Sequence, residues 1–274
     1  MRTVVHLSDL HFSKVAHRLL TPLVEAVIAA TPDVVVVSGD LTQRARTAEF
    51  LEARAFLERL PRPQVVVPGI HDVPLHNVLH RWLRPLEKFQ LHVESNLTPS
   101  FVDTEIAVVG VNTARSLALK NGRINAQQLE CVRSVFAGVA DAVVKVVVTH
   151  HPFDVPPVIK ARARVGRAGL AIPALARCGV DLLLAGHLHA SRASSTGDRY
   201  PFSGYEALIV SAGTATSTRG RGEANSFNLL RLSKTRIEVE RLEWVDERQC
   251  FLTSSLQVFA RNLGGGSWIA CERR

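Results

Sequence analysis

The first two thirds of the chain alternates short apolar runs with amphipathic segments. The run at residues 34–37 consists of valine alone, which is typical of a strand covered on both faces, and similar strands are predicted at 4–7 and 65–67. Between these runs, apolar residues recur at helical spacing. This spacing predicts helices at residues 19–30, 47–60, 127–136 and 170–177, and a loop with a helix at 73–89.

Further strands are predicted later in the chain. They are predicted at residues 106–111, 143–148 and 180–184, followed by an antiparallel meander at 208–210, 226–232 and 236–244. This order of elements indicates an α/β fold in which two mixed β-sheets pack together and are flanked by helices, a four-layer α/β/β/α sandwich. We expect a single domain from residue 1 to 260 and a loosely held C-terminal tail at 261–274, where three consecutive glycines stand.

Composition limits the class of protein. The 274 residues suit one large domain, and a hydrophobic share of 46% is enough for a sizeable core. The four cysteines form no CxxC pair, so we expect reduced thiols, a cytoplasmic location and no cysteine-bound zinc. No apolar run approaches the roughly 20 residues of a membrane helix. Residues 1–7 resemble a strand, so we expect no targeting segment there.

The formal net charge of +8 raises the question of nucleic-acid binding. Few of the 33 basic residues are lysines, and the arginines are spread over the whole length. This distribution favours a solvated basic surface over a nucleic-acid groove, although it leaves nucleic acid open as a partner. Such a surface would attract a phosphoester small molecule or nucleotide. We expect no membrane partner, and a homo-oligomer is compatible with the sequence.

Five short segments that carry aspartate or histidine each follow a predicted strand. They are Asp9-Leu10-His11, Gly39-Asp40, Gly69-Ile70-His71-Asp72, His150-His151-Pro152 and Gly186-His187-Leu188-His189. Carboxylates and imidazoles delivered to the ends of strands are the ligands from which a sheet assembles a two-metal hydrolytic site. Each segment alone is a weak signal, but their conjunction predicts one metal centre.

Spacing within the segments indicates how the side chains would converge. Asp9 and His11 are two residues apart, so in an extended segment their side chains would point to the same side and bind one ion together. Gly39 permits a tight turn that places Asp40 at the carboxyl edge of the sheet. His150 and His151 are adjacent, so their side chains should diverge, and we expect only one of them to be a ligand.

The order of these segments resembles the pattern of the calcineurin-like metallophosphoesterases, which is DxH, GD, GNHD, a histidine and GHxH. The likeness extends from about residue 3 to beyond residue 213. It implies the four-layer fold and phosphoester hydrolysis at two divalent ions, for which manganese, iron and zinc suit the mixed ligands. The first, second and fifth segments are most similar to bacterial class III cyclic-nucleotide phosphodiesterases, which favours a diester over a monoester.

The resemblance also implies a role for each residue. The implied metal ligands are Asp9, His11 and His189 for one ion, His150 and His187 for the other, and Asp40 as a bridge between them. His150 is preferred to His151 because the family's ligand precedes an x-Pro step. His71 would be a catalytic acid that binds no metal, and Asp72 would orient it.

Ile70 departs from the family pattern, which has asparagine between Gly69 and His71. The asparagine amide oxygen would be a ligand of the second ion, and isoleucine has no donor atom, so the affinity for that ion should fall. Three explanations stay open: a catalytically weakened and even engineered form, a natural variant with one strongly bound ion, or a working enzyme with a looser second ion. We favour an altered but recognisable hydrolase site.

Substrate contacts are harder to assign. Arg115, His76 and His151 are the candidates. A plain loop arginine is the favoured interpretation of Arg115, and His76 fits the polar face of a helix equally well. Arg162, Arg164 and Arg167 lie between the last two segments and form either a basic flap or a solvated loop. A P-loop and a GxSxG serine elbow are both absent from the sequence.

The sequence therefore predicts a metal-dependent phosphodiester hydrolase. The alternatives are a metal-dependent nuclease, a redox enzyme with an iron centre, and an inactive scaffold that retains the fold. A nuclease would show a contiguous basic groove and strong dependence of binding on salt. A redox enzyme would consume dioxygen without releasing phosphate, and a scaffold would be inactive with any metal.

Overall fold

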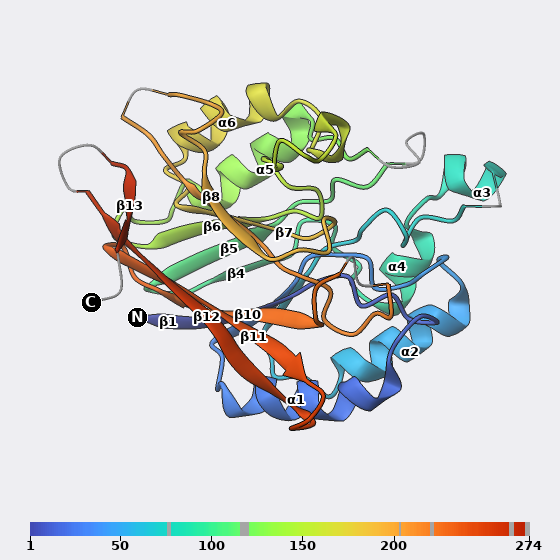
Figure 1. Ribbon diagram of the computed structural model, residues 1–274. Helices are drawn as coiled ribbons and strands as arrows, with labels where there is room; N and C mark the ends of the chain where they lie inside the picture. The colour runs from blue at the N-terminus through green and yellow to red at the C-terminus, as the bar shows by residue number, and fades with distance from the viewer. Residues whose placement is uncertain (76–77, 116–120, 203, 220–221, 263–265, 272–274) are drawn as a thin grey trace.

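Two β-sheets pack face to face in the centre of the molecule (Figure 1). The computed structural model describes residues 1–75, 78–115, 121–202, 204–219, 222–262 and 266–271, without the side chains of 78–80. The seven-stranded sheet has the order β13 (Trp268–Cys271), β12 (Cys250–Arg261), β11 (Arg236–Val245), β10 (Ser226–Leu232), β1 (Arg2–Leu7), β2 (Val34–Val37), β3 (Gln64–Val66). The six-stranded sheet has the order β4 (Ser100–Val102), β5 (Ile106–Gly110), β6 (Val144–Val148), β7 (Leu182–Ala185), β9 (Leu208–Ser211), β8 (Arg192–Ser195).

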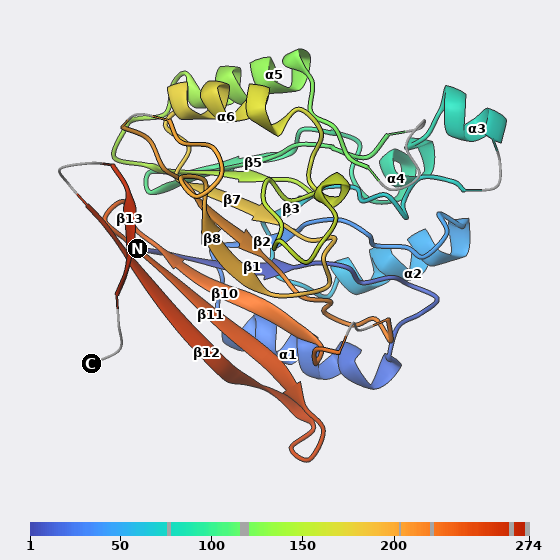
Figure 2. The same ribbon diagram turned by 45° about the horizontal axis from the view of Figure 1, so that its top comes forward.

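Helices cover the outer face of each sheet (Figure 2). The longer ones are α1 (Leu20–Ala29) and α2 (Thr47–Leu57) on the seven-stranded sheet, and α5 (Ala126–Phe136) and α6 (Ala168–Arg177) on the six-stranded sheet. The shorter ones are the 3-10 turns His17–Leu19 and Ala161–Ala163, α3 (Val78–Leu83) and α4 (Glu87–His92). The predicted four-layer α/β/β/α sandwich is confirmed. Among the helices that the structure describes, none is long and apolar enough to span a membrane.

Alternate residues of the central strands face different layers, which explains the continuous valine runs. In β2, Val34 and Val36 pack between the two sheets, in one core with Val108 of β5. Their neighbours Val35 and Val37 pack on the other side, among the side chains of α1 and α2. A strand buried on both faces has no solvent side on which a polar residue would be favoured.

Parallel pairing brings the polar segments to one edge. β1, β2 and β3 are parallel neighbours in the first sheet, and β5, β6, β7 and β9 are parallel neighbours in the second. Their carboxyl ends therefore lie at the same edge of each sheet. The five predicted segments follow β1, β2, β3, β6 and β7 directly. Ligand sites of open α/β sheets lie outside the carboxyl ends of the strands, so the topology positions all five segments for one site.

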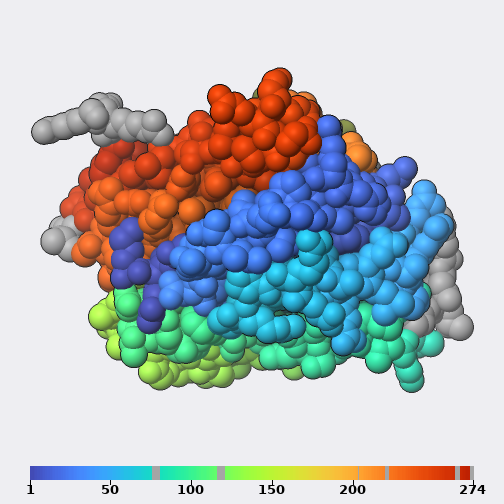
Figure 3. Space-filling model, turned by 90° about the horizontal axis from the view of Figure 1, so that it is seen from below, coloured from blue at the N-terminus to red at the C-terminus, as the bar shows by residue number. Residues whose placement is uncertain are grey.

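The C-terminal region is more ordered than we expected. β12 and β13 were not predicted, and the loosely held tail is a wrong prediction for residues 268–271, which pair with β12. Trp268 is buried, and the guanidinium of Arg261 lies 4.8 Å from the centre of its ring. β12 escaped prediction because its middle residues 252–255 are exposed and the strand lacks regular alternation of apolar and polar residues. Figure 3 shows α1 against these late strands, so the two ends of the chain share one surface.

Candidate metal centre

The predicted metal ligands adopt an unusual backbone conformation. Asp9, His11, Asp40, His187 and His189 have φ angles of 53°, 52°, 54°, 70° and 56°, in the left-handed region. This conformation costs a non-glycine residue on the order of 1–3 kcal/mol and is concentrated at functional sites. Asp9 and His11 therefore converge through left-handed turns, and the extended geometry that we assumed for them is wrong.

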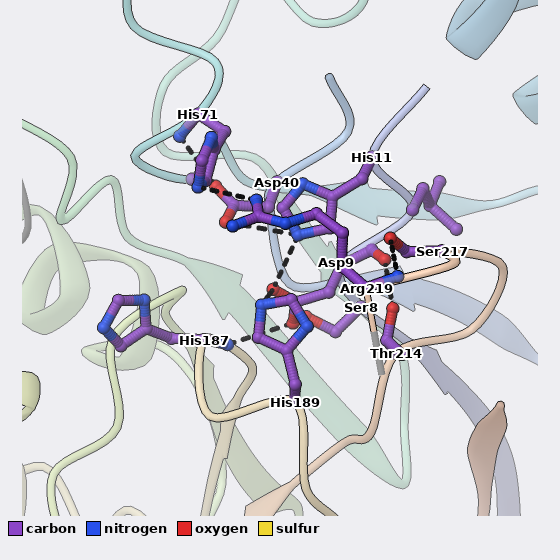
Figure 4. Close-up of polar contacts among 12 residues, drawn as sticks. Ser8, Asp9, His11, Asp40, His71, His187, His189, Thr214, Ser217 and Arg219 are labelled. Carbon is purple, nitrogen blue, oxygen red and sulfur yellow. Dashed lines mark hydrogen bonds and ion pairs between the residues drawn. The ribbon is translucent and has the colours of Figure 1, made fainter. Parts of the chain in front are cut away.

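Asp9 is held so that one carboxylate oxygen faces the site (Figure 4). Its Oδ2 accepts hydrogen bonds from Ser8 Oγ at 2.6 Å and from the backbone N–H of His187 at 3.0 Å. Thr214 Oγ1 donates to the Asp9 carbonyl at 2.7 Å. A Cβ atom at Gly186 would lie 1.8 Å from Ser8 Oγ, which explains the glycine of this segment. Oδ1 of Asp9 is buried without a hydrogen-bond partner among the described residues.

The first ligand group consists of Asp9, His11 and His189. Oδ1 of Asp9 lies 3.5 Å from Nε2 of His11 and 3.4 Å from Nε2 of His189. The two rings are stacked with centroids 5.1 Å apart. Ligand atoms that bind one tetrahedral ion at about 2.1 Å are about 3.4 Å from one another. The three residues that we predicted for the first ion therefore have the spacing of a metal site.

Asp40 lies between this group and His150. Its Oδ2 is 3.8 Å from Nε2 of His11 and 3.3 Å from Nε2 of His150, while its Oδ1 accepts the backbone N–H of His71 at 2.8 Å. A Cβ atom at Gly69 would lie 2.1 Å from Oδ1, so only glycine permits this approach. Asp40 thus occupies the position predicted for a bridging ligand.

His150 is oriented by the neighbouring sheet. Its Nδ1 pairs with the carbonyl oxygen of Ser38 at 2.8 Å, so Nδ1 carries the proton and Nε2 faces Asp40. A backbone carbonyl in this role fixes the tautomer of a metal-binding histidine. Asp9, Asp40 and His150 bring one ligand atom each within 4.8 Å of the other two.

His187 and His151 form a second group with His150. The ring centroids of His150 and His151 are 5.0 Å apart, and that of His187 lies 5.2 Å from the first and 4.6 Å from the second. The prediction that His150 and His151 diverge is therefore wrong. His151 is fully buried, which also contradicts its assignment as a substrate contact. In Figure 4 the ring of His187 stands apart from Asp9 and His189.

The carboxylates are ionised. Burial opposes the negative charge of Asp9 and Asp40. For Asp9, the combined effect of His189, His11 and His150 outweighs burial. For Asp40, the charge and hydrogen bond of His150 act together with the charges of His71 and His11, so both carboxyl pKa values lie below their ordinary range. Two buried negative charges at the sheet edge favour divalent cations.

The imidazoles differ in protonation. Burial, together with the charge of His150, lowers the pKa of His187 to about 4 and that of His151 well below its usual range. Burial also disfavours protonation of His150, but Asp40 outweighs it and raises the pKa of His150 to about 9. Histidine binds a metal ion in its neutral form. A metal ion that binds to this group of imidazoles therefore has to displace one proton, that of His150.

His71 has a partner that we did not predict. Its Nδ1 pairs with the carbonyl oxygen of Gln43 at 2.9 Å, and its Nε2 lies 3.4 Å from a guanidinium nitrogen of Arg219. Burial, more than any neighbouring charge, lowers the pKa of His71. A backbone carbonyl has no signature in the sequence, and Arg219 lies 148 residues away in the chain, so neither contact could be predicted.

Asp72 supports the loop and not the ring of His71, so the predicted orienting role is wrong. Its carboxylate accepts hydrogen bonds from the backbone N–H groups of Gly69, Leu41 and Thr42 at 2.8, 3.2 and 2.8 Å. The hydroxyl of Thr42 adds a fourth at 2.9 Å. Asp72 thereby joins the loop after β3 to the loop after β2 that carries Asp40.

A cavity of about 640 Å³ opens onto these groups. Asp40, His71, His187 and His189 line it, and Ile70 lines it with a side chain that carries no donor atom. Five basic residues also line it: Arg44, Arg81, Lys160, Arg162 and Arg219. The centre therefore faces a hollow suited to an anion, and Arg162 is the one member of the expected basic flap in its lining.

The other predicted contacts are outside this lining or outside the described residues. Arg115 is outside the lining of this cavity, and its pKa is lowered by burial and then by the charge of Arg167. Arg164 donates to the hydroxyl of Tyr200 at 3.2 Å. His76 falls outside the residues that the structure describes.

Comparison with known proteins agrees with this geometry. The model of the calcineurin-like phosphoesterase family matches residues 2–191. None of the curated proteins matches in sequence.

Among solved structures, a purple acid phosphatase from yellow lupin (Lupinus luteus) superposes with a TM-score of 0.71 at 11% identity, over 96% of this chain. The match spans about half, 54%, of the lupin chain. PhoD gives a TM-score of 0.71 at 10% identity over 99% of this chain and 72% of its own. A dimetal phosphatase from Danio rerio gives 0.63 at 14% identity over 92% and 98%. At these identities the structures show a shared fold.

Proposed function

The chain belongs to the calcineurin-like phosphoesterase family, and we propose that it hydrolyses a phosphodiester at a dinuclear metal centre built on Asp40. The observation that carries this proposal is the position of Asp40 Oδ2, 3.8 Å from Nε2 of His11 and 3.3 Å from Nε2 of His150. One carboxylate oxygen thus faces both ligand groups. When bound, two divalent ions supply charge neutralisation for phosphoryl oxygens and a water of lowered pKa.

The donor set suits ions of intermediate softness. Two carboxylates and several imidazoles are typical ligands of manganese, iron and zinc. Asp9, His11 and His189 would hold the first ion and His150 and His187 the second, with Asp40 common to both. We expect the second ion to be the weaker one, because Ile70 contributes no oxygen where the family has an asparagine amide.

The basic lining of the cavity would bind the substrate phosphate. Arg219 is the member closest to the catalytic histidine, since its guanidinium donates to Gln43 Oε1 at 3.1 Å and lies beside His71 Nε2. A planar guanidinium offers paired N–H groups to two phosphoryl oxygens. Arg219 would thereby hold the phosphoryl group within reach of His71.

His71 would move the proton of the leaving group. The carbonyl of Gln43 fixes its Nδ1–H, so Nε2 is the atom that can take up a proton and pass it to the departing alcohol oxygen. The lowered pKa of His71 leaves the ring neutral at pH 7. The protonated form that acts as an acid is therefore a minority at neutral pH and grows as the pH falls.

A diester is favoured over a monoester by the apolar part of the cavity. Val73, Leu75, Val158 and Leu188 line it beside the basic residues. A phosphodiester brings a second organic group that such a wall can cover, while a monoester leaves more of this apolar surface exposed to water. A small phosphodiester or a nucleotide combines the two features.

The test uses the purified chain reconstituted with Mn²⁺, Fe²⁺ or Zn²⁺ and offered bis-p-nitrophenyl phosphate, p-nitrophenyl phosphate and cyclic nucleotides. We expect the diester to be cleaved faster than the monoester, with Asp40→Asn reducing turnover by at least about 100-fold. Inactivity of every metal form would overturn the proposal in favour of a scaffold. Dioxygen consumption without phosphate release would do so in favour of a redox enzyme.

A further inference from the structure

The three imidazoles of His150, His151 and His187 form a compact triangle beside the first ligand group. Their ring centroids are 5.0, 5.2 and 4.6 Å apart, and each residue brings a ligand-capable nitrogen within 4.8 Å of the other two. His150 and His151 are fully buried. The role proposed above for the second ion uses two of these rings and leaves His151 unexplained.

His151 has one engaged nitrogen and one unused nitrogen. Its Nδ1 pairs with Thr113 Oγ1 at 2.9 Å, and its Nε2 is buried without a hydrogen-bond partner among the described residues. His150 has a similar arrangement, with Nδ1 on the carbonyl of Ser38 and with Nε2 buried without a hydrogen bond of good geometry, 3.3 Å from Asp40 Oδ2. A buried polar atom without a partner is costly and calls for an explanation. Two such Nε2 atoms in one cluster are explained together if they bind a cation.

The surroundings of His151 are built to hold its ring. A Cβ atom at Gly122 would lie 2.1 Å from His151 Nδ1, so a glycine is required for the ring to occupy this position. Thr113 Oγ1 also accepts the backbone N–H of His151 at 3.3 Å. When Nδ1–H donates to Thr113, Nε2 keeps its lone pair, which is the pattern of histidines that bind metal through Nε2.

We propose that His151 is a ligand of the second ion, which is held by the three imidazoles of His150, His151 and His187. This inference rests on the proposed dinuclear function. His151 supplies the donor atom that Ile70 does not. With the shared oxygen of Asp40, the three imidazoles give the second ion four protein ligands, a nitrogen-rich set that suits Zn²⁺. The second position therefore favours Zn²⁺ over Mn²⁺, while the first, with Asp9 and Asp40, accepts the harder ion.

The experiment compares wild type, His151→Gln and the matched control His6→Gln. His6 is also fully buried, and its Nε2 pairs with Ser38 Oγ at 2.9 Å, so it controls for the exchange of a buried histidine near the site. Each protein is stripped with chelator and titrated with Co²⁺, whose visible spectrum distinguishes four-coordinate from six-coordinate ions. Zn²⁺ content is measured in parallel by elemental analysis.

We expect wild type and His6→Gln to bind two ions, one of them with an intense four-coordinate spectrum. His151→Gln should lose that spectrum and weaken the second ion by at least about tenfold, while the first ion stays. Equal affinity and an unchanged spectrum in His151→Gln would overturn the proposal. These readouts need no turnover, so an inactive protein with this spectrum would refute the proposed hydrolysis and leave the three-imidazole site standing.

A double variant distinguishes the loss of a metal ligand in His151→Gln from misfolding of that variant. Ile70→Asn restores an amide oxygen at the site, so the combination of Ile70→Asn with His151→Gln should recover tight binding of the second ion. Failure of this rescue in a protein with a native circular dichroism spectrum would contradict the proposal.

Discussion

Oδ2 of Asp40 lies 3.3 Å from Nε2 of His150, although 110 residues separate them in the chain. β2 delivers the first from the seven-stranded sheet and β6 delivers the second from the six-stranded sheet. The candidate metal centre therefore joins the two sheets at their carboxyl edge. Changes that alter this contact should affect metal binding, hydrolysis and stability together.

Ile70→Asn should strengthen the second ion and increase turnover of bis-p-nitrophenyl phosphate. The amide oxygen would add a ligand at a cavity-lining position that now offers only carbon, and we expect about a tenfold gain in affinity for the second ion. Isothermal titration of metal into stripped protein measures it. Ile70→Val, which also lacks a donor, is the control. Equal affinity for the second ion in wild type and Ile70→Asn would contradict this expectation.

His71→Gln should reduce kcat by about 10²–10⁴-fold without changing metal content. The loss should be larger for an alkyl leaving group than for p-nitrophenolate, which departs without a proton. Because the pKa of His71 is lowered, the wild-type rate with the alkyl substrate should rise as the pH falls through the range below 6.5 in which His71 becomes protonated. An equal loss for both leaving groups would show that His71 does not act as an acid.

Arg219→Ala should raise KM for the diester several-fold and leave the metal content unchanged, because Arg219 lines the cavity and contacts no predicted metal ligand in the described structure. The guanidinium fork matters as well as the charge, so Arg219→Lys should recover only part of the loss. Arg236→Ala, which removes an arginine of β11 paired with Glu238, is the matched control. An unchanged KM in Arg219→Ala would remove this residue from the substrate site.

The metal-free protein should lose stability between about pH 6.5 and 9. Burial disfavours protonated His150, but Asp40 raises its pKa from 6.5 to about 9. A folded pKa above the unfolded one gives stabilisation that is complete below pH 6.5 and lost as the pH rises through 9. Asp9 and Asp40, whose pKa values are lowered, contribute fully throughout this window.

We expect the free energy of unfolding to fall by on the order of 1–3 kcal/mol across that interval. Urea denaturation of chelator-treated protein at the two pH values measures it. The metal-loaded protein should show a smaller fall, since His150 is then neutral at both. Equal stability of the metal-free form at pH 6.5 and 9 would show that the proton on His150 is not linked to folding.

Much of the fold followed from the sequence because its strands are buried on both faces. The valine run predicted β2, and the helical spacing of apolar residues predicted α1, α2, α5 and α6. The structure contains all five elements, and their ends differ from the predicted ends by at most a few residues. The late strands β12 and β13 carry no such signal. β12 is held by its pairing with β11, and β13 by its pairing with β12 and by the burial of Trp268. These tertiary contacts leave no local pattern in the sequence.

The convergence of the candidate ligand residues was predictable for a similar reason. Each stands directly after a strand, and parallel strands bring their carboxyl ends to one edge. The turns that orient them were not predictable. Aspartate and histidine are enriched in the left-handed region, but most of them are found elsewhere, so the sequence does not show that Asp9 and His11 adopt it. The convergence of His151 with His150 depends on Thr113 and Gly122, far away in the chain, so adjacency in sequence pointed to the wrong geometry.

The central claim is that Asp40 bridges two ions. Anomalous scattering from crystals of the metal-loaded protein, recorded on both sides of the absorption edges of Mn and Zn, tests it most directly. We predict two peaks about 4 Å apart with Asp40 between them, one beside Asp9, His11 and His189 and the other beside His150. A single peak away from Asp40, or two peaks that its carboxylate does not contact, would contradict the account.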